Sequence, residues 1–140
     1  LVTNNWAPKI RSGIMIWTPP LAAADVAIEE LRKAVIKQNK STHIIFIPKL
    51  LTPYWIKQFY KATNLVLTLP PIHSFWPSDM HEPLFIGFVL PYARYFPYRV
   101  RGTPKLLELQ RKMQSLLKDD TLGGRNLLSK FLEEVSLFYF

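Results

Sequence analysis

The sequence predicts an α/β fold, and three short apolar runs support this prediction. The run THIIFIP is rich in branched residues and is typical of a buried strand at 43–47. The runs LVLTL and LFIGFVL predict further strands at 65–69 and 84–90. Helical patterns lie before and between these strands. We therefore expect a partial Rossmann-like, three-layer sheet followed by C-terminal helices.

The first strand follows a lead-in at 1–13, where a proline and Gly13 argue against regular structure. The sequence IMIW then predicts a brief strand at 14–17. The strand must end at the Thr-Pro-Pro turn, because each proline has a fixed φ and no backbone N–H.

Two helices are expected between the strands. The helix at 22–39 has a broad apolar face, with acidic residues early and basic residues late, as the helix dipole favours. The helix at 53–63 has Thr52 as a candidate N-cap and Pro53 at its first position. Two right-handed crossovers would make the first three strands parallel, with the last strand antiparallel at the sheet edge.

The C-terminal part predicts two more helices. The first spans 103–120, where Thr103 is the expected N-cap and Pro104 occupies the first helical position. Two glycines interrupt the chain, and the sequence NLLSKFLEEVSLFYF predicts a last helix with an unusually apolar end.

The chain carries a large excess of positive charge. Its 140 residues include 18 Lys and Arg against 10 Asp and Glu, a formal net charge of +8. This excess favours polyanionic partners, nucleic acid first, although ordinary solubility charge on helix faces is the alternative. No apolar run approaches the roughly 18 residues that span a bilayer, so we expect no membrane partner.

Composition also bears on the setting of the chain. Cysteine is absent, which allows a reducing compartment, and we expect an intracellular protein, cytoplasmic or nuclear. The sequence does not start with Met, so we expect it to be an excised piece of a longer protein.

Arginine and aromatic residues interleave in the sequence PYARYFPYRVRG. The guanidinium groups of Arg94, Arg99 and Arg101 can hold phosphates, and the neighbouring rings can stack on bases. We predict that nucleic acid binds along this segment and continues to Lys49 and Lys105. The alternative is an edge segment whose rings face the core while its arginines extend into solvent.

A long connector, PPIHSFWPSDMHEP, precedes the strand at 84–90. Long loops are often functional, but an aromatic cover over the sheet end is the alternative. Its four potential ligands match no familiar metal-binding spacing, so we predict no metal site there; they are His73, Asp79, His81 and Glu82.

The glycine and serine patterns argue against most enzymes. The five glycines form neither G-x-G-x-x-G nor a P-loop, and no G-x-S-x-G elbow occurs. We therefore expect no cofactor and no catalytic residue in this chain alone.

The strand and turn IMIWTPPL resemble the Asp/Asn/Ser-Pro-Pro-aromatic turn of amino-group DNA methyltransferases. In that family the turn holds the target amino group and stacks on the flipped base. The elements that follow resemble the second half of that fold. They are also similar to a region downstream of reverse transcriptase and RNase H in DIRS-type retrotransposon polyproteins. By this resemblance, 1–102 is a methyltransferase-like half-domain and 103–140 a helical extension.

Two positions depart from the family's turn. Thr18 replaces the Asp, Asn or Ser, and Leu21 replaces the aromatic residue. The glycine-containing cofactor loop of the family is also missing from the sequence. Thr18, Pro19, Pro20 and Leu21 are therefore candidates for a vestigial motif, and a plain strand terminator is the alternative.

We expect a non-catalytic nucleic-acid-binding module of a retroelement protein, with DNA or RNA and upstream polyprotein domains as partners. One alternative is a fragment of a DNA adenine methyltransferase-like enzyme. The other is a protein-interaction module that uses the aromatic connector and the apolar C-terminus.

Overall fold

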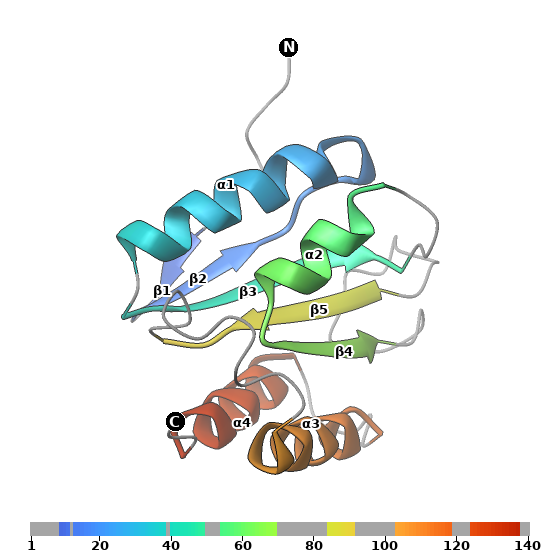
Figure 1. The fold of residues 1–140 in the computed structure, drawn as a ribbon. Helices are drawn as coiled ribbons and strands as arrows, with labels where there is room; N and C mark the ends of the chain where they lie inside the picture. The colour runs from blue at the N-terminus through green and yellow to red at the C-terminus, as the bar shows by residue number, and fades with distance from the viewer. Residues whose placement is uncertain are drawn as a thin grey trace.

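A five-stranded sheet lies between two layers of helices (Figure 1). The computed structural model describes residues 9–11, 13–38, 40–49, 54–69, 84–91, 103–118 and 124–137. The strands are β1 (Lys9–Arg11), β2 (Ile14–Trp17), β3 (Thr42–Pro48), β4 (Leu65–Leu69) and β5 (Leu84–Val89). The helices are the 3₁₀ turn η1 (Leu21–Ala23), α1 (Ala24–Lys37), α2 (Ile56–Ala62), α3 (Pro104–Leu117) and α4 (Gly124–Ser136).

The helices cover both faces of the sheet. Helices α1 and α2 lie on one face, and α3 and α4 lie on the other. Side chains of β3 alternate between the two cores: Ile45 and Ile47 pack toward α1 and α2, whereas Ile44 and Phe46 pack toward α3 and α4. The predicted α/β class and three-layer arrangement are thus confirmed.

The strand order is β1-β2-β3-β5-β4. Strands β2 and β3 pair in parallel, and β5 pairs antiparallel with both β3 and β4. Strands β2, β3 and β4 therefore run in one direction, as predicted. The expected edge position of the antiparallel strand was wrong, because β5 lies between β3 and β4. All six residues of β5 are buried, whereas residues of β4 alternate between buried and half-buried, which suits an edge.

Three residues of the lead-in, Lys9–Arg11, form a strand, contrary to the expectation of no regular structure there. β1 pairs antiparallel with β2, and Arg11 lies opposite Ile14. Two residues connect the strands, and the second, Gly13, has a φ of 80°. Glycine adopts this left-handed conformation at little cost, so Gly13 permits a tight hairpin here rather than an irregular chain.

The helix ends agree with the sequence predictions in part. α3 begins as expected, because the Thr103 hydroxyl accepts a hydrogen bond from the Leu106 N–H at 3.3 Å and Pro104 follows the cap. α2 begins at Ile56 rather than at residue 53. The candidate cap at Thr52 and the proline after it lie outside the described residues.

Helix α2 lies very close to the middle of β5. A Cβ atom added at Gly87 would lie 2.7 Å from Phe59 Cε1 and 2.7 Å from Thr63 Cγ2. Phe59 is fully buried, and its ring stacks against Phe85 with centroids 5.9 Å apart. The missing side chain at position 87 therefore allows Phe59 to lie directly against the strand.

We expect Gly87→Ala to lower the free energy of unfolding by about 1–3 kcal/mol, because the core there has no room for a methyl group. Denaturant unfolding of Gly87→Ala, Phe59→Leu and the double variant measures the effect. The loss of stability in the double variant should be smaller than the sum of the losses in the two single variants, because leucine at position 59 leaves room for the methyl group at position 87.

Gly13→Ala is the matched control. Nothing lies within 4 Å of an added Cβ atom there, so its cost comes from the backbone conformation alone. It should show no coupling to Phe59→Leu. Additive losses for Gly87→Ala and Phe59→Leu would contradict the close contact.

Candidate functional site

The candidate vestigial turn lies at the carboxyl end of β2. Thr18 and Pro20 are exposed, Pro19 is buried and Leu21 is 48% exposed. Lys49 follows β3, which runs parallel to β2, so the carboxyl ends of both strands lie at the same end of the sheet. Ligands of parallel sheets usually bind beyond the carboxyl ends of the strands.

A side-chain hydrogen bond joins the starts of α1 and α2. The Tyr54 hydroxyl donates to Asp25 Oδ2 at 2.5 Å, and the Val26 N–H donates to Asp25 Oδ1 at 2.9 Å. The hydroxyl, and then the N–H, lower the pKa of Asp25, while the same carboxylate raises the pKa of Tyr54. The carboxyl group therefore stays ionised and links the two helices.

The predicted basic residues fall in different places. Arg94, Arg99 and Arg101 lie outside the described residues. The Lys49 ammonium lies 5.9 Å from the centroid of the Phe85 ring, which belongs to the core under α1 and α2. Lys105 is on α3, on the opposite face of the sheet, and lines a small cavity of about 110 Å³ with Glu108 and Glu134. The structure therefore does not bring the two lysines together.

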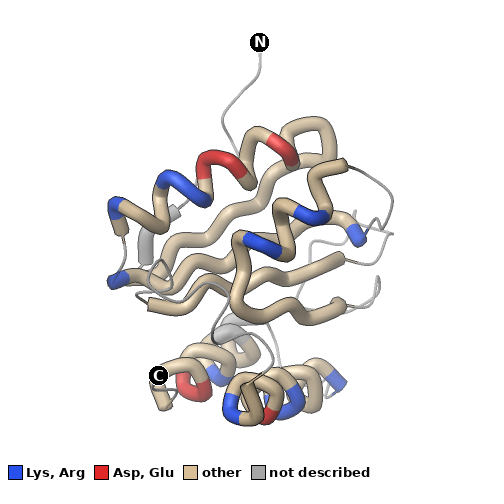
Figure 2. Tube along the Cα trace, viewed as in Figure 1, with Lys and Arg blue, Asp and Glu red and all other residues tan. Residues whose placement is uncertain are grey.

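A second group of lysines lies on α2. Lys57 and Lys61 are exposed, and α2 carries no acidic residue (Figure 2). On α1, by contrast, Arg32 pairs with Glu29 at 3.1 Å and Lys33 pairs with Glu30 at 3.6 Å. Lys49, Lys57 and Lys61 have no ion-pair partner in the described part of the chain. We call these three residues the lysine face.

No sequence motif predicts Lys57 and Lys61 as site residues, but the distribution of charge along the chain contains a signal for them. Between residues 31 and 78 there is no Asp or Glu. The same stretch holds seven basic residues: Arg32, Lys33, Lys37, Lys40, Lys49, Lys57 and Lys61. Arg32 and Lys33 pair with Glu29 and Glu30, which precede this stretch, whereas Lys57 and Lys61 have no carboxylate within their own segment of the sequence.

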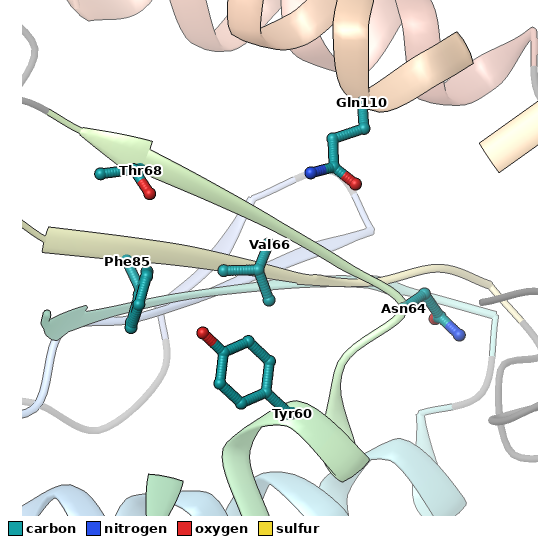
Figure 3. Close-up of a pocket in the computed structure, with 6 residues that line it drawn as sticks. All are labelled: Tyr60, Asn64, Val66, Thr68, Phe85 and Gln110. Atoms are coloured by element: carbon teal, nitrogen blue, oxygen red, sulfur yellow. The ribbon is translucent and has the colours of Figure 1, made fainter. Parts of the chain in front are cut away.

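A cavity of about 330 Å³ opens beside the lysine face, along the outer edge of β4 (Figure 3). We call it the β4-edge cavity. The centroid of the Phe85 ring is 5.9 Å from the Lys49 ammonium and 5.9 Å from the centroid of the Tyr60 ring. The cavity is lined by Tyr60, Asn64, Val66, Thr68, Phe85 and Gln110.

Contacts with neighbouring residues fix two of the side chains that line the β4-edge cavity, Tyr60 and Asn64. Tyr60 makes edge-to-face contacts with both Phe59 and Phe85, which fix its ring. Asn64 joins β4 to β5: its N–H donates to the Phe88 carbonyl at 2.8 Å, and its Oδ1 accepts from the Leu90 N–H at 2.8 Å. A ligand would therefore meet a largely preformed site.

Comparisons with known proteins identify no relative. No protein-family model, curated protein or solved structure matches the chain. The described residues hold no cluster of three metal-ligating side chains. The four potential ligands of the connector, for which the sequence predicts no metal site, lie outside the described residues; they are His73, Asp79, His81 and Glu82. Within the same ranges, no helix is both long enough and apolar enough to cross a bilayer.

His43 is a buried polar residue that no sequence pattern marks. The Trp17 indole N–H donates to His43 Nδ1 at 3.4 Å. Since an indole can only donate, Nδ1 carries the lone pair and Nε2–H donates to the Gln38 carbonyl at 3.3 Å. Burial lowers the pKa of His43, against the opposing effect of the Gln38 hydrogen bond. The neutral imidazole thus links β2, β3 and the end of α1.

We expect the protein to lose stability as the pH falls below about 6.5, the ordinary pKa of histidine. The unfolded chain binds a proton there before folded His43 does, so the free energy of unfolding falls by up to about 1.4 kcal/mol per pH unit. Denaturant unfolding at several pH values measures this slope. His43→Leu should be less stable at neutral pH and should show a flatter slope; an unchanged slope would contradict the assignment.

Proposed function

We propose that this chain is a non-catalytic module that binds single-stranded nucleic acid. The observation that supports this best is the lysine face beside the β4-edge cavity. Lysine ammonium groups without carboxylate partners can neutralise phosphates, and an adjacent aromatic wall can receive bases. The two kinds of contact that a nucleic-acid strand needs therefore lie next to each other.

The arrangement of the lysine face suits an extended strand. Lys57 and Lys61 are one helical turn apart on the exposed side of α2, and the Lys49 ammonium lies 5.9 Å from the Phe85 ring, which Tyr60 of α2 also contacts. A chain of phosphates passing over α2 could contact these lysines in turn while its bases turn toward the β4-edge cavity. Arg94, Arg99 and Arg101, which the sequence predicts as phosphate contacts, belong to the same proposal.

The retroelement setting is part of the same proposal and rests on the resemblance. The element order strand, helix, strand, helix and late antiparallel strand pair is the order that the resemblance involves. Upstream polyprotein domains would then deliver the nucleic acid.

The enzyme-fragment alternative has one supporting observation. The Thr-Pro-Pro turn lies at the carboxyl end of β2, beside the parallel strand β3. If the chain were such a fragment with a working cofactor site, calorimetric titration with S-adenosylmethionine would give a saturable heat. We expect none, because the glycine-containing cofactor loop is missing.

We expect the Lys57→Gln, Lys61→Gln double variant to bind a single-stranded oligonucleotide more weakly and with a weaker salt dependence. Each lost phosphate contact should reduce the log–log salt slope by about 0.7, so two should reduce it by about 1.4. Replacing all three arginines, Arg94, Arg99 and Arg101, by glutamine should reduce it by about 2. Fluorescence anisotropy at several salt concentrations measures the slopes.

The matched control removes the same charge from α1. Arg32→Gln with Lys33→Gln also lowers the net charge by two, but both side chains already pair with glutamates. This control should change the slope far less than the α2 variant. Equal slopes for both double variants would show that net charge, and not the lysine face, governs binding.

A further inference from the structure

The outer edge of β4 is covered at one residue by a side-chain amide. Gln114 of α3 lies beside Thr68, and its Nε2 donates to the Thr68 carbonyl at 3.2 Å. In return, the Thr68 N–H donates to Gln114 Oε1 at 3.5 Å. The backbone N–H and C=O of Thr68 therefore both point away from β5, and a planar donor–acceptor group satisfies them together.

Val66 presents the same pair of groups without such a cover. It precedes Thr68 by two residues, so its backbone N–H and C=O point to the same side of the strand. Val66 itself lines the β4-edge cavity. Within the described part of the chain, no other element donates a hydrogen bond to the Val66 C=O or accepts one from its N–H.

Gln110 lies one turn before Gln114 on α3 and lines the same cavity. Four helical residues rise about 6 Å, close to the 6.6–6.8 Å or so between alternate strand residues. Gln110 is therefore placed near Val66 much as Gln114 is placed near Thr68. No hydrogen bond of the Gln110 carboxamide occurs among the described residues, so its amide is available to a ligand.

We propose that the β4-edge cavity holds one unpaired nucleobase of a bound strand, which forms two hydrogen bonds to the Val66 backbone. This inference rests on the proposed function and deepens it. Each base has adjacent donors and acceptors on its Watson–Crick edge, and these could replace the amide seen at Thr68. In a duplex that edge is occupied by the partner base. The cavity would thus select single strands over duplexes without selecting a sequence.

The surroundings favour a base over an extended peptide. Adding a peptide strand requires several outward-facing residues, but the outward groups of Thr68 are already bonded to Gln114. Only Val66 is left, and a base needs only one residue. Tyr60 supplies an aromatic wall from α2, and the lysine face supplies phosphate contacts next to it.

The direct test follows the Val66 amide by ¹⁵N NMR during titration. The probes are a deoxyadenosine decamer and a decamer of the same phosphates with abasic sugars. We expect both probes to shift the amides of Lys57 and Lys61, and only the deoxyadenosine decamer to shift the Val66 amide. A duplex of the same length should leave Val66 unchanged.

Variants test the side chains. Tyr60→Ala should weaken binding of the deoxyadenosine decamer about 5- to 150-fold, the range expected for one stacked base, and should leave the salt slope unchanged. Gln110→Leu should weaken the same complex, while binding of the abasic decamer stays constant. Gln58→Leu, on the exposed face of α2, is the matched control and should have no effect.

The outcomes separate this inference from the proposed function. If neither decamer binds the unmodified protein, the proposed function and the base site both fail. If the deoxyadenosine decamer binds through the lysine face but the Val66 amide does not shift, the function stands and the base site is wrong. If an extended threonine- and valine-rich peptide shifts Val66 and the decamer does not, the edge takes a protein strand, which also overturns the inference.

Discussion

The close contact between α2 and Gly87 of β5 is the constraint on which the rest of the structure depends. Strand β5 lies between β3 and β4 in the sheet. Helix α2 connects β3 to β4 along the chain, so it must cross over β5. Only a residue without a side chain allows Phe59 to lie against β5. This packing places Tyr60 beside Phe85, and these two side chains line the β4-edge cavity.

Most of the fold could be predicted from the sequence because its patterns are local. Apolar runs marked the strands, and the Thr103–Pro104 pair marked the start of α3. The position of β5 was missed because strands consecutive in the chain were expected to be neighbours in the sheet. The run LFIGFVL contained the better signal, since apolar residues at nearly every position indicate a strand covered on both faces. Gly13 was misjudged because a hairpin glycine and an irregular-loop glycine look alike in sequence.

The site was less predictable, for a physical reason. The lysine face is visible in the sequence as a long stretch without acids, once charges are counted by segment. The β4-edge cavity depends instead on the direction of the backbone N–H and C=O groups of β4. It also depends on the match between the rise of one turn of α3 and the spacing of alternate residues in β4. Gln114 and Thr68 are 46 residues apart, so their pairing could not be read from spacing. The interleaved arginines, which the sequence made prominent, lie outside the described residues.

Amide hydrogen exchange of the free protein tests the central claim, that β4 is an edge strand with open backbone groups at Val66. We predict that the Leu65 and Leu67 amides, which point toward β5, exchange slowly, and that the Val66 amide exchanges much faster. The Thr68 amide should be intermediate and should lose its protection in Gln114→Ala. Protection of Val66 equal to that of Leu67 would show that this edge is already paired and would contradict the claim.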